Sequence, residues 1–163
     1  LSPDRLVINS GGKSERFIKK EYPELPDQAF VHYGNFIGET LKIAADLHIP
    51  NVTMGIMIGK TVKLAEGFLD THSKKTVMNK DFLEQVAGES GCTPQASDSI
   101  CEMTLARELW TRLSASDKDR LFPALLRLCL HHCMPLLPHS HLTILLMDED
   151  GNIPYRTESS HSS

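Results

Sequence analysis

The stretch from Asn51 to Ser73 constrains the fold most, because an apolar strand pattern runs directly into a helical pattern. Residues 52–58 form a short apolar run with the length and β-branching of a buried strand. Gly59, Lys60 and Thr61 interrupt that run, and the apolar positions after them spread around a short helix, which indicates heavy burial. Because strand, glycine turn and helix form half of a βαβ unit, the stretch predicts an α/β fold.

The predicted turn at Gly59 also has the chemistry of an anion site. Backbone N–H groups at a helix start lack intrahelical partners and lie at the positive end of the helix dipole. Lys60 lies in the turn, and Lys63 follows it on the same side of the helix. An ordinary turn with solvated lysines explains this pattern equally well. A P-loop is not expected, because only three residues separate Gly55 from Gly59 and all three fit the strand.

An earlier segment repeats the strand–turn–helix pattern. Leu6–Ile8 has the pattern of a short strand, and the segment Ser10–Glu15 follows it. In that segment Gly11 and Gly12 can point consecutive N–H groups at one place and so form an anion nest. The alternative is an ordinary surface turn.

A third strand is expected over residues 29–33, and Asn35 is a suitable N-cap for a helix over residues 36–48. That helix carries apolar side chains on two faces, which predicts that it is sandwiched against a sheet. Gly38 in its first turn costs roughly 1 kcal/mol relative to alanine. The glycine therefore indicates either that some group approaches the backbone there, beside Glu39, or that the helix packs tightly on the sheet.

The chain of 163 residues has the size of one domain, which we expect over residues 1–157, with a disordered tail at 158–163. The formal net charge of −4 argues against nucleic acid as the main partner, and no apolar run is long enough for a membrane span. Four cysteines without disulfide or zinc spacing favour a reducing cytoplasm. The chain begins without methionine or a signal pattern, so we expect a piece of a longer protein.

Beyond Ser73 the sequence predicts a more helical part and then a hairpin. The expected elements are helices over residues 79–87, from Ser97 or Ser99 to Leu113 and over 121–134, strands over 142–147 and 153–156, and a hairpin turn at Asp150–Gly151. Ser116 and Asp119 resemble a capping box for the last helix. The whole pattern predicts an α/β fold with a mainly parallel sheet, helices on both faces, a helical C-terminal part and a terminal β-hairpin.

A cluster of cysteines and histidines has the chemistry of metal ligands but lacks their spacing. Cys129, His132 and Cys133 share one face of the last predicted helix, and prolines separate them from His139 and His141. That face is apolar around the cysteines, and buried free cysteines are common core residues. We therefore expect no metal site.

Three blocks of residues, taken in order, carry a family resemblance: Ser10–Glu15, Asn35–Glu39, and Ile58–Gly67 followed by Asp70–Ser73. Together they resemble the C-terminal part of the CbiD family, the cobalt-precorrin-5B C1-methyltransferases of the anaerobic cobalamin pathway. The resemblance is specific over residues 5–90 and looser to about residue 157.

The resemblance implies a domain of an S-adenosylmethionine-dependent methyltransferase, with cobalt present only as part of the substrate. The chain departs from the family pattern at Ile56 and Met57, where the family has glycine and histidine. The family's N-terminal part has no counterpart here. The resemblance therefore implies the C-terminal domain of a larger enzyme, which is inactive alone and has that N-terminal part and a cobalt-precorrin as partners.

The matched positions imply which residues are functional, and their chemistry suggests roles. His72 is the expected catalytic residue, because a histidine can hold a carboxylate or move a proton near neutral pH. Lysines at the turns would receive substrate carboxylates, and Glu39 would hold the ribose hydroxyls of S-adenosylmethionine. The expected substrate- or cofactor-binding residues are Gly11, Gly12, Lys13, Ser14, Asn35, Gly38, Glu39, Gly59, Lys60, Lys63 and Thr71.

Two other functions stay open from the residues alone. One is a non-catalytic module that binds a nucleotide or anion, and the other is an interaction domain that completes the fold of a larger corrin-pathway protein. In each case the three glycine-containing turns follow predicted parallel strands. We therefore expect the turns to converge at one edge of the sheet.

Overall fold

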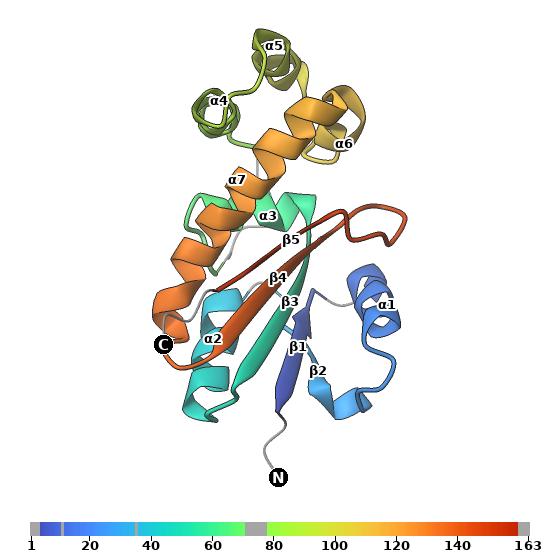
Figure 1. Ribbon diagram of the computed structural model, residues 1–163, viewed down its shortest axis with the longest axis vertical. Coiled ribbons are helices and arrows are strands. Elements are labelled where there is room, and N and C mark those ends of the chain that lie inside the picture. Colours follow the sequence, from blue (N-terminus) through green and yellow to red (C-terminus); the bar gives the residue numbers. More distant parts are fainter. Residues whose placement is uncertain (1–3, 11, 35, 71–77, 160–163) are drawn as a thin grey trace.

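The fold is centred on a five-stranded sheet with the strand order β2-β1-β3-β4-β5 (Figure 1). The computed structural model describes residues 4–10, 12–34, 36–70 and 78–159. The strands are β1 (Arg5–Asn9), β2 (Phe30–His32), β3 (Asn51–Met57), β4 (His141–Met147) and β5 (Tyr155–Glu158). Strands β2, β1, β3 and β4 are parallel, and β5 pairs antiparallel with β4. The predicted α/β fold, with its mainly parallel sheet and terminal antiparallel pair, is confirmed.

The two long central strands owe their position to their apolar sequences. Every residue from Val52 to Ile56 in β3 is buried, and so is every residue from Leu142 to Met147 in β4. A nearly continuous apolar run suits a parallel strand that is covered on both faces. By contrast, β5 alternates between partly buried and exposed residues and follows Pro154, as expected for an edge strand.

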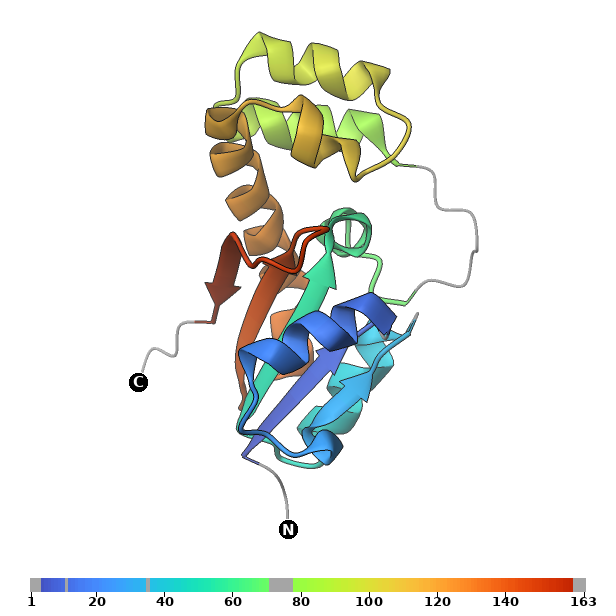
Figure 2. The ribbon, with the colours of Figure 1, turned by 90° about the vertical axis from the view of Figure 1, so that its right-hand side faces the viewer.

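Helices cover both faces of the sheet, as predicted (Figure 2). The helices are α1 (Gly12–Glu21), α2 (Ile37–Asp46), α3 (Ile58–Ala65), α4 (Lys80–Glu89), α5 (Pro94–Glu102), α6 (Glu108–Arg112) and α7 (Ala115–Cys133), with short 3-10 helices η1 (Asp27–Ala29) and η2 (Met134–Leu136). On one face, Ile18 of α1 packs with Val7 and Met147 in a small buried cluster. On the other face, α2, α3 and α7 contribute to the main hydrophobic core.

The helical part is an insertion within the sheet and not an appendage after it. Strand β4 pairs in parallel with β3 along its whole length, from Asn51–His141 to Met57–Met147. The chain therefore leaves the sheet after α3, forms α4 to α6 beyond the carboxyl edge, and returns along α7 to start β4 (Figure 1). This arrangement places a helical layer above the edge at which the parallel strands end.

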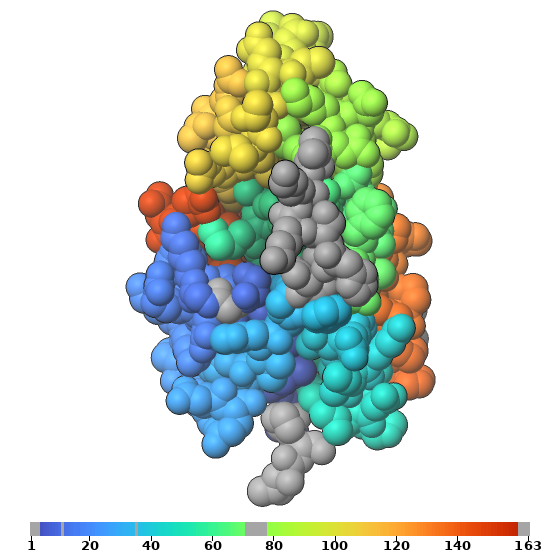
Figure 3. Space-filling view, turned by 180° about the vertical axis from the view of Figure 1, so that it is seen from behind, coloured from blue at the N-terminus to red at the C-terminus, as the bar shows by residue number. Residues whose placement is uncertain are grey.

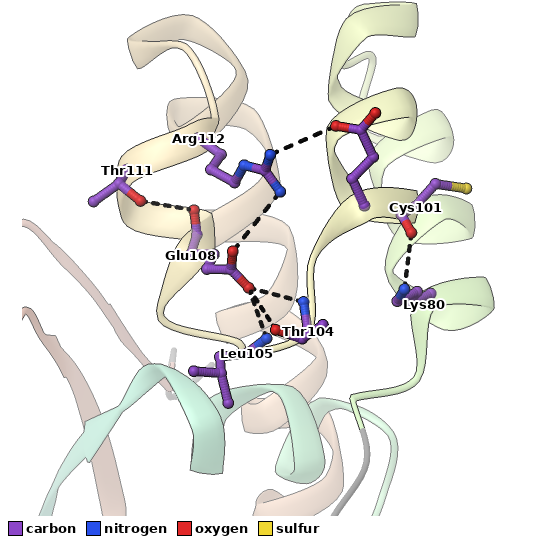
Figure 4. Close-up of polar contacts among 8 residues, drawn as sticks. Lys80, Cys101, Thr104, Leu105, Glu108, Thr111 and Arg112 are labelled. Carbon is purple, nitrogen blue, oxygen red and sulfur yellow. Dashed lines mark hydrogen bonds and ion pairs between the residues drawn. The ribbon is translucent and has the colours of Figure 1, made fainter.

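Two carboxylates hold the helical layer together. Asp117 is buried and accepts hydrogen bonds from Thr93 N at 2.9 Å and from Thr93 Oγ1 at 2.6 Å. Glu108 accepts hydrogen bonds from the backbone N–H groups of Thr104 and Leu105, both at 2.8 Å (Figure 4). These bonds join the start of α5 to the start of α7 and fix the turn between α5 and α6.

The Glu108 contacts explain why one predicted helix is in fact two. The sequence predicted a single helix from Ser97 or Ser99 to Leu113, but α5 already begins at Pro94 and ends at Glu102. The side chain of Glu108 binds the N–H groups of the intervening turn, so α6 starts separately. The prediction was wrong there because the pattern of apolar residues continues across the turn.

Two further predicted boundaries were wrong. The N-cap of α7 is Ser114, whose Oγ accepts from Asp117 N at 3.2 Å, and not Ser116 of the predicted capping box. Strand β5 continues to Glu158, and Ser159 is buried with its N–H bonded to Leu142 O at 2.8 Å. The sequence therefore placed the start of the disordered tail too early, at residue 158.

Candidate functional site

The carboxyl ends of β1, β2 and β3 meet at one edge of the sheet, because these strands are parallel neighbours. Gly12 follows β1, Gly34 follows β2, and Lys60 lies in the first turn after β3. The predicted convergence of the turns is confirmed for these residues, whereas Gly11 and Asn35 lie outside the described residues. The strand order reverses between β1 and β3, and ligands of open α/β sheets bind outside the carboxyl ends at such a point.

The turn after β1 is fixed by a pair of serines. Ser10 N donates to Ser14 Oγ at 3.1 Å, and the two hydroxyl oxygens are 2.8 Å apart. Gly12 has a φ of 55°, a left-handed conformation that glycine adopts readily. Ser14 is buried, so it shapes the turn, and the exposed Lys13 at the helix start is the group available to a ligand.

The start of α3 differs from its prediction. The helix begins at Ile58, directly after β3, so the predicted glycine turn at Gly59 was wrong and Gly59 lies within the first helical turn. Thr61 Oγ1 donates to Met57 O at 2.9 Å and closes the junction between strand and helix. No loop separates strand and helix here, which agrees with the rejection of a P-loop.

The first turn of α3 combines a helix start, a lysine and a glycine at the sheet edge. Lys60 is partly buried, and burial lowers the pKa of its ammonium group. Gly59 is exposed, and a Cβ added there would meet no atom within 4 Å. The helix dipole and Lys60 both favour an anion at this position, and Gly59 leaves the backbone open to one.

Gly38 is approached closely, which is the first of the two alternatives that the sequence left open, and the approaching group is a residue of the chain itself. Gly38 N donates to Asp70 Oδ1 at 2.9 Å, and a Cβ at Gly38 would lie 3.2 Å from Asp70 Oδ2 and 3.2 Å from Leu69 Cβ. Ile37 N also bonds to Leu69 O at 3.1 Å. The start of α2 therefore already has a carboxylate, with the exposed Glu39 beside it.

A second group of residues at this edge was not predicted. The imidazole of His32, at the end of β2, contacts the carboxylate of Glu15 in the first turn of α1. Hydrogen bonds from Lys19 and then from His32 lower the pKa of Glu15. The spacing of Glu15 and Lys19 on a helix was visible in the sequence, but nothing local indicated that His32 would join them.

A cavity of about 450 Å³ lies between the helical layer and the loop after β4. Its charged lining residues are Arg107, Glu108, Lys118, Asp148, Glu149 and Asp150. The loop also packs on α1, because a Cβ at Gly151 would lie 2.7 Å from Phe17 Cδ1, and Lys13 Nζ lies 5.8 Å from the centroid of the same ring. The cavity thus adjoins the carboxyl edge. Sequence reasoning missed it because its two sides are far apart in the chain.

Of the cysteine and histidine cluster, only the two cysteines belong to the core. Cys129 and Cys133 are buried, and Cys129 Sγ donates to Thr61 O at 3.3 Å. Burial raises the pKa of both thiols. Within the described ranges, no group of three or more histidine, cysteine, aspartate or glutamate side chains is placed to hold a metal, and no helix is long and apolar enough to cross a membrane.

The two other expected site residues, Thr71 and His72, lie outside the described residues. They follow Asp70, which sits at the start of α2 on the carboxyl edge. The structure therefore brings together the turns of Lys13 and Lys60, with Glu39 on the neighbouring helix. It defines the class of the protein as an open α/β domain with these turns at its carboxyl edge.

Comparison with known proteins identifies the family. The family model described as "CbiD, C-terminal domain" matches residues 70–158. A protein of Geobacillus sp. (strain WCH70), named cobalt-precorrin-5B C(1)-methyltransferase, is 35% identical over 134 residues, which cover 82% of this chain and 36% of the relative. A protein of the same name from Prosthecochloris aestuarii is 35% identical over 150 residues, covering 91% and 41%. No solved structure is a significant match.

The chain belongs to the CbiD family, as the three sequence blocks predicted. The family model begins at Asp70, after the glycine-containing blocks, whereas the matches to the relatives cover most of the chain. The chain spans 36–41% of the length of these relatives.

Proposed function

We propose that this chain forms the C-terminal part of a cobalt-precorrin-5B C1-methyltransferase and supplies one wall of its active site. The supporting observation is the first turn of α3, where Lys60 and an open helix start lie at the carboxyl edge beside the β1 turn. The named relatives carry this activity in chains more than twice as long. The remaining region of the enzyme completes the site, and the cytoplasm is the compartment proposed for it.

In this reaction the main task of the protein is to orient the two reactants. The acceptor carbon belongs to an electron-rich conjugated ring and is itself the nucleophile, so the protein need not supply one. Holding two reactants in line can contribute roughly 7–11 kcal/mol to lowering the barrier. An ordered edge built from parallel strands is well suited to this task, because the sheet fixes the positions of the turns.

The macrocyclic substrate carries several carboxylates, and the edge offers receptors for them. Lys13 and Lys60 lie at two adjacent helix starts, and Lys63 follows one turn later on α3. A carboxylate bound at the start of α3 would gain from the backbone N–H groups and from the ammonium group together. The negative net charge of the whole chain does not argue against this carboxylate site, because the electrostatic field there depends mainly on the nearest charged groups.

The start of α2 fits the methyl donor better than the substrate. Glu39 and Asp70 place carboxylate oxygens there, which can accept hydrogen bonds from ribose hydroxyls but repel other carboxylates. S-adenosylmethionine, when bound, supplies a methyl group on a positively charged sulfur. We propose that Glu39 orients the ribose, and that His72 and Thr71 hold a substrate carboxylate or move a proton beside it.

Titration of the chain with cobalt-precorrin-5B, followed by its visible absorbance, tests the proposal. Lys60→Met should weaken binding at least tenfold, which is about 1.4 kcal/mol. Lys20→Met is the matched control, because Lys20 is exposed at the opposite end of α1. Equal losses in the two variants, or no binding by the unaltered chain, would contradict the proposed site.

Turnover separates binding from catalysis. We expect the chain alone to unfold cooperatively and to form no methylated product, because the relatives extend well beyond it. Mass spectrometry of cobalt-precorrin-5B incubated with S-adenosylmethionine and the chain detects the product. Methylation by this chain alone would show that the remaining region is not needed.

A further inference from the structure

Helix α2 has an apolar face that the described structure does not cover. Its inner face buries Ile37, Leu41 and Ala44 in the main core. On the outer face, Phe36 is 44% exposed, Ile43 is 53% exposed and Leu47 is 56% exposed. The sequence predicted that both faces would be buried, and the structure shows that only the inner one is.

The exposed residues form one continuous ridge. Positions 36, 40, 43 and 47 recur at three- and four-residue spacing, so they share one line along the helix. Position 40 is Thr40, whose hydroxyl donates to Phe36 O at 2.7 Å. This hydroxyl is therefore already hydrogen-bonded and interrupts the apolar surface little. We call Phe36, Thr40, Ile43 and Leu47 the α2 ridge.

Neighbouring elements enlarge the apolar surface. Val31 of the edge strand β2 is 37% exposed and pairs with Ile8, whose side chain belongs to the core on the α2 side. Phe68 is 54% exposed and lies two residues before Asp70, which forms a bridge with Phe36. Figure 3 shows the atoms of α2 in cyan beside those of β2 in lighter blue on one face of the molecule. The surface is therefore broader than one helix.

The charged border of the ridge lies on one side. Glu39, Lys42 and Asp46 are exposed and fall on the same flank of the helix, whereas the other flank is buried through Ala44. A partner that covers the ridge should thus offer an apolar groove with charged residues of both signs on a single border. Exposed apolar surfaces with a polar rim commonly mark interaction sites.

The chain path indicates which polypeptide covers the ridge. Asp4 O accepts from Asn51 N at 3.2 Å and from Asn51 Nδ2 at 3.1 Å, so the chain enters β1 beside the start of β3. That point lies only a few residues beyond the end of α2 at Asp46. Asp4 therefore lies at the amino edge of the sheet, at the Leu47 end of the ridge.

We infer that the α2 ridge docks the region of the CbiD protein that lies outside the part matched by this chain. The matched residues are only 36% of one relative and 41% of another, so the unmatched region is large enough to cover the ridge and its neighbours. The inference rests on membership of the family and on the proposal that the chain is part of a longer enzyme. It does not depend on methyl transfer.

A chimera tests the inference. The unmatched region of the Geobacillus sp. (strain WCH70) relative is joined ahead of Leu1, and Ile43→Cys is labelled with a maleimide in a Cys101→Ser background, because Cys101 is the exposed native thiol. We expect labelling at least tenfold slower in the chimera than in the chain alone. Leu105→Cys is the matched control, because Leu105 is 50% exposed in the turn between α5 and α6, and its rate should not change.

A second measurement guards against variants that fold poorly. Hydrogen exchange of the unaltered chimera and the unaltered chain should show slower exchange over residues 36–48 in the chimera alone. Equal labelling and equal exchange in the two proteins would overturn the inference. So would a dimer of the chain alone that Ile43→Asp converts to a monomer, because the ridge would then join two copies. Neither readout uses turnover, so failure here is distinguishable from failure of the proposed function.

Discussion

The helices after β2 and β3 start at the same edge of the sheet, but their first turns are used in opposite ways. At the start of α2, the chain supplies its own anion, because Asp70 accepts from Gly38 N at 2.9 Å. At the start of α3, Gly59 faces open space and Lys60 adds positive charge. The same local pattern, a glycine in a first helical turn, therefore marks an internal contact in one helix and the proposed anion site in the other.

The largest expected effect on stability is at Asp117, a buried carboxylate that accepts a backbone hydrogen bond as Asp70 does. Asp117 accepts two hydrogen bonds from Thr93, and Asp117→Ala leaves both donors without that carboxylate. We expect the free energy of unfolding to fall by about 3 kcal/mol. Chemical denaturation measures the loss. Asp98→Ala, at an exposed position of α5 in the same layer, should change stability little.

The hydrogen bonds of Asp117 also predict that the helical layer loses stability at acidic pH. The hydrogen bond from the Thr93 side chain is the main cause that lowers the pKa of Asp117. Its stabilising contribution is therefore fully present above the unfolded pKa, near 4, and is lost as the pH falls through the lower folded pKa. Denaturation curves across this range should show a larger loss in the unaltered chain than in Asp117→Ala, in which Glu15 and other carboxylates with lowered pKa values remain.

Gly38→Ala tests the internal contact at α2 directly. The added methyl group would lie 3.2 Å from both Leu69 Cβ and Asp70 Oδ2, so these neighbours must shift. We expect a loss of about 1–2 kcal/mol in stability. The matched control is Gly88→Ala in α4, where a Cβ meets no atom within 4 Å and alanine should stabilise the helix by roughly 0.5–1 kcal/mol. Similar changes in both variants would break the comparison.

Gly59→Ala should behave like the control in stability and differ from it in binding. A Cβ there meets no atom within 4 Å, so the melting temperature should hold or rise slightly. If an anion reaches the backbone of α3 at this point, the affinity for cobalt-precorrin-5B should fall even though the fold is intact. Unchanged affinity would assign Gly59 to local geometry alone.

The smallest effect is a shift in the pKa of Lys60. Burial lowers this pKa in the unliganded chain, and a bound anion should raise it, because a nearby negative charge favours the ammonium form. NMR titration of ¹³C-methylated lysines, assigned with Lys60→Met, measures the change on adding ligand. A constant pKa would place the anion away from α3.

Much of the sheet followed from local sequence. The apolar runs of β3 and β4 are patterns of neighbouring residues, and so are the turn residues between β4 and β5. Such patterns can be recognised without knowledge of distant contacts. The same is true of the glycine turns, which is why their common edge was predictable once the strands were taken as parallel. The end of β3 was misplaced by one residue, and α3 starts at Ile58, before the predicted turn, because Thr61 binds the last strand residue, Met57, and removes the need for a turn.

What the sequence determined by itself was the class of fold, the family and the edge at which the glycine-containing turns lie, because these depend on short-range patterns and matched blocks. The tertiary structure alone decided that Asp70 occupies the start of α2, that His32 meets Glu15, and that α2 leaves one apolar face exposed. Each of these depends on contacts between segments distant in the chain. Such contacts are set by how the layers pack, and no local periodicity encodes them.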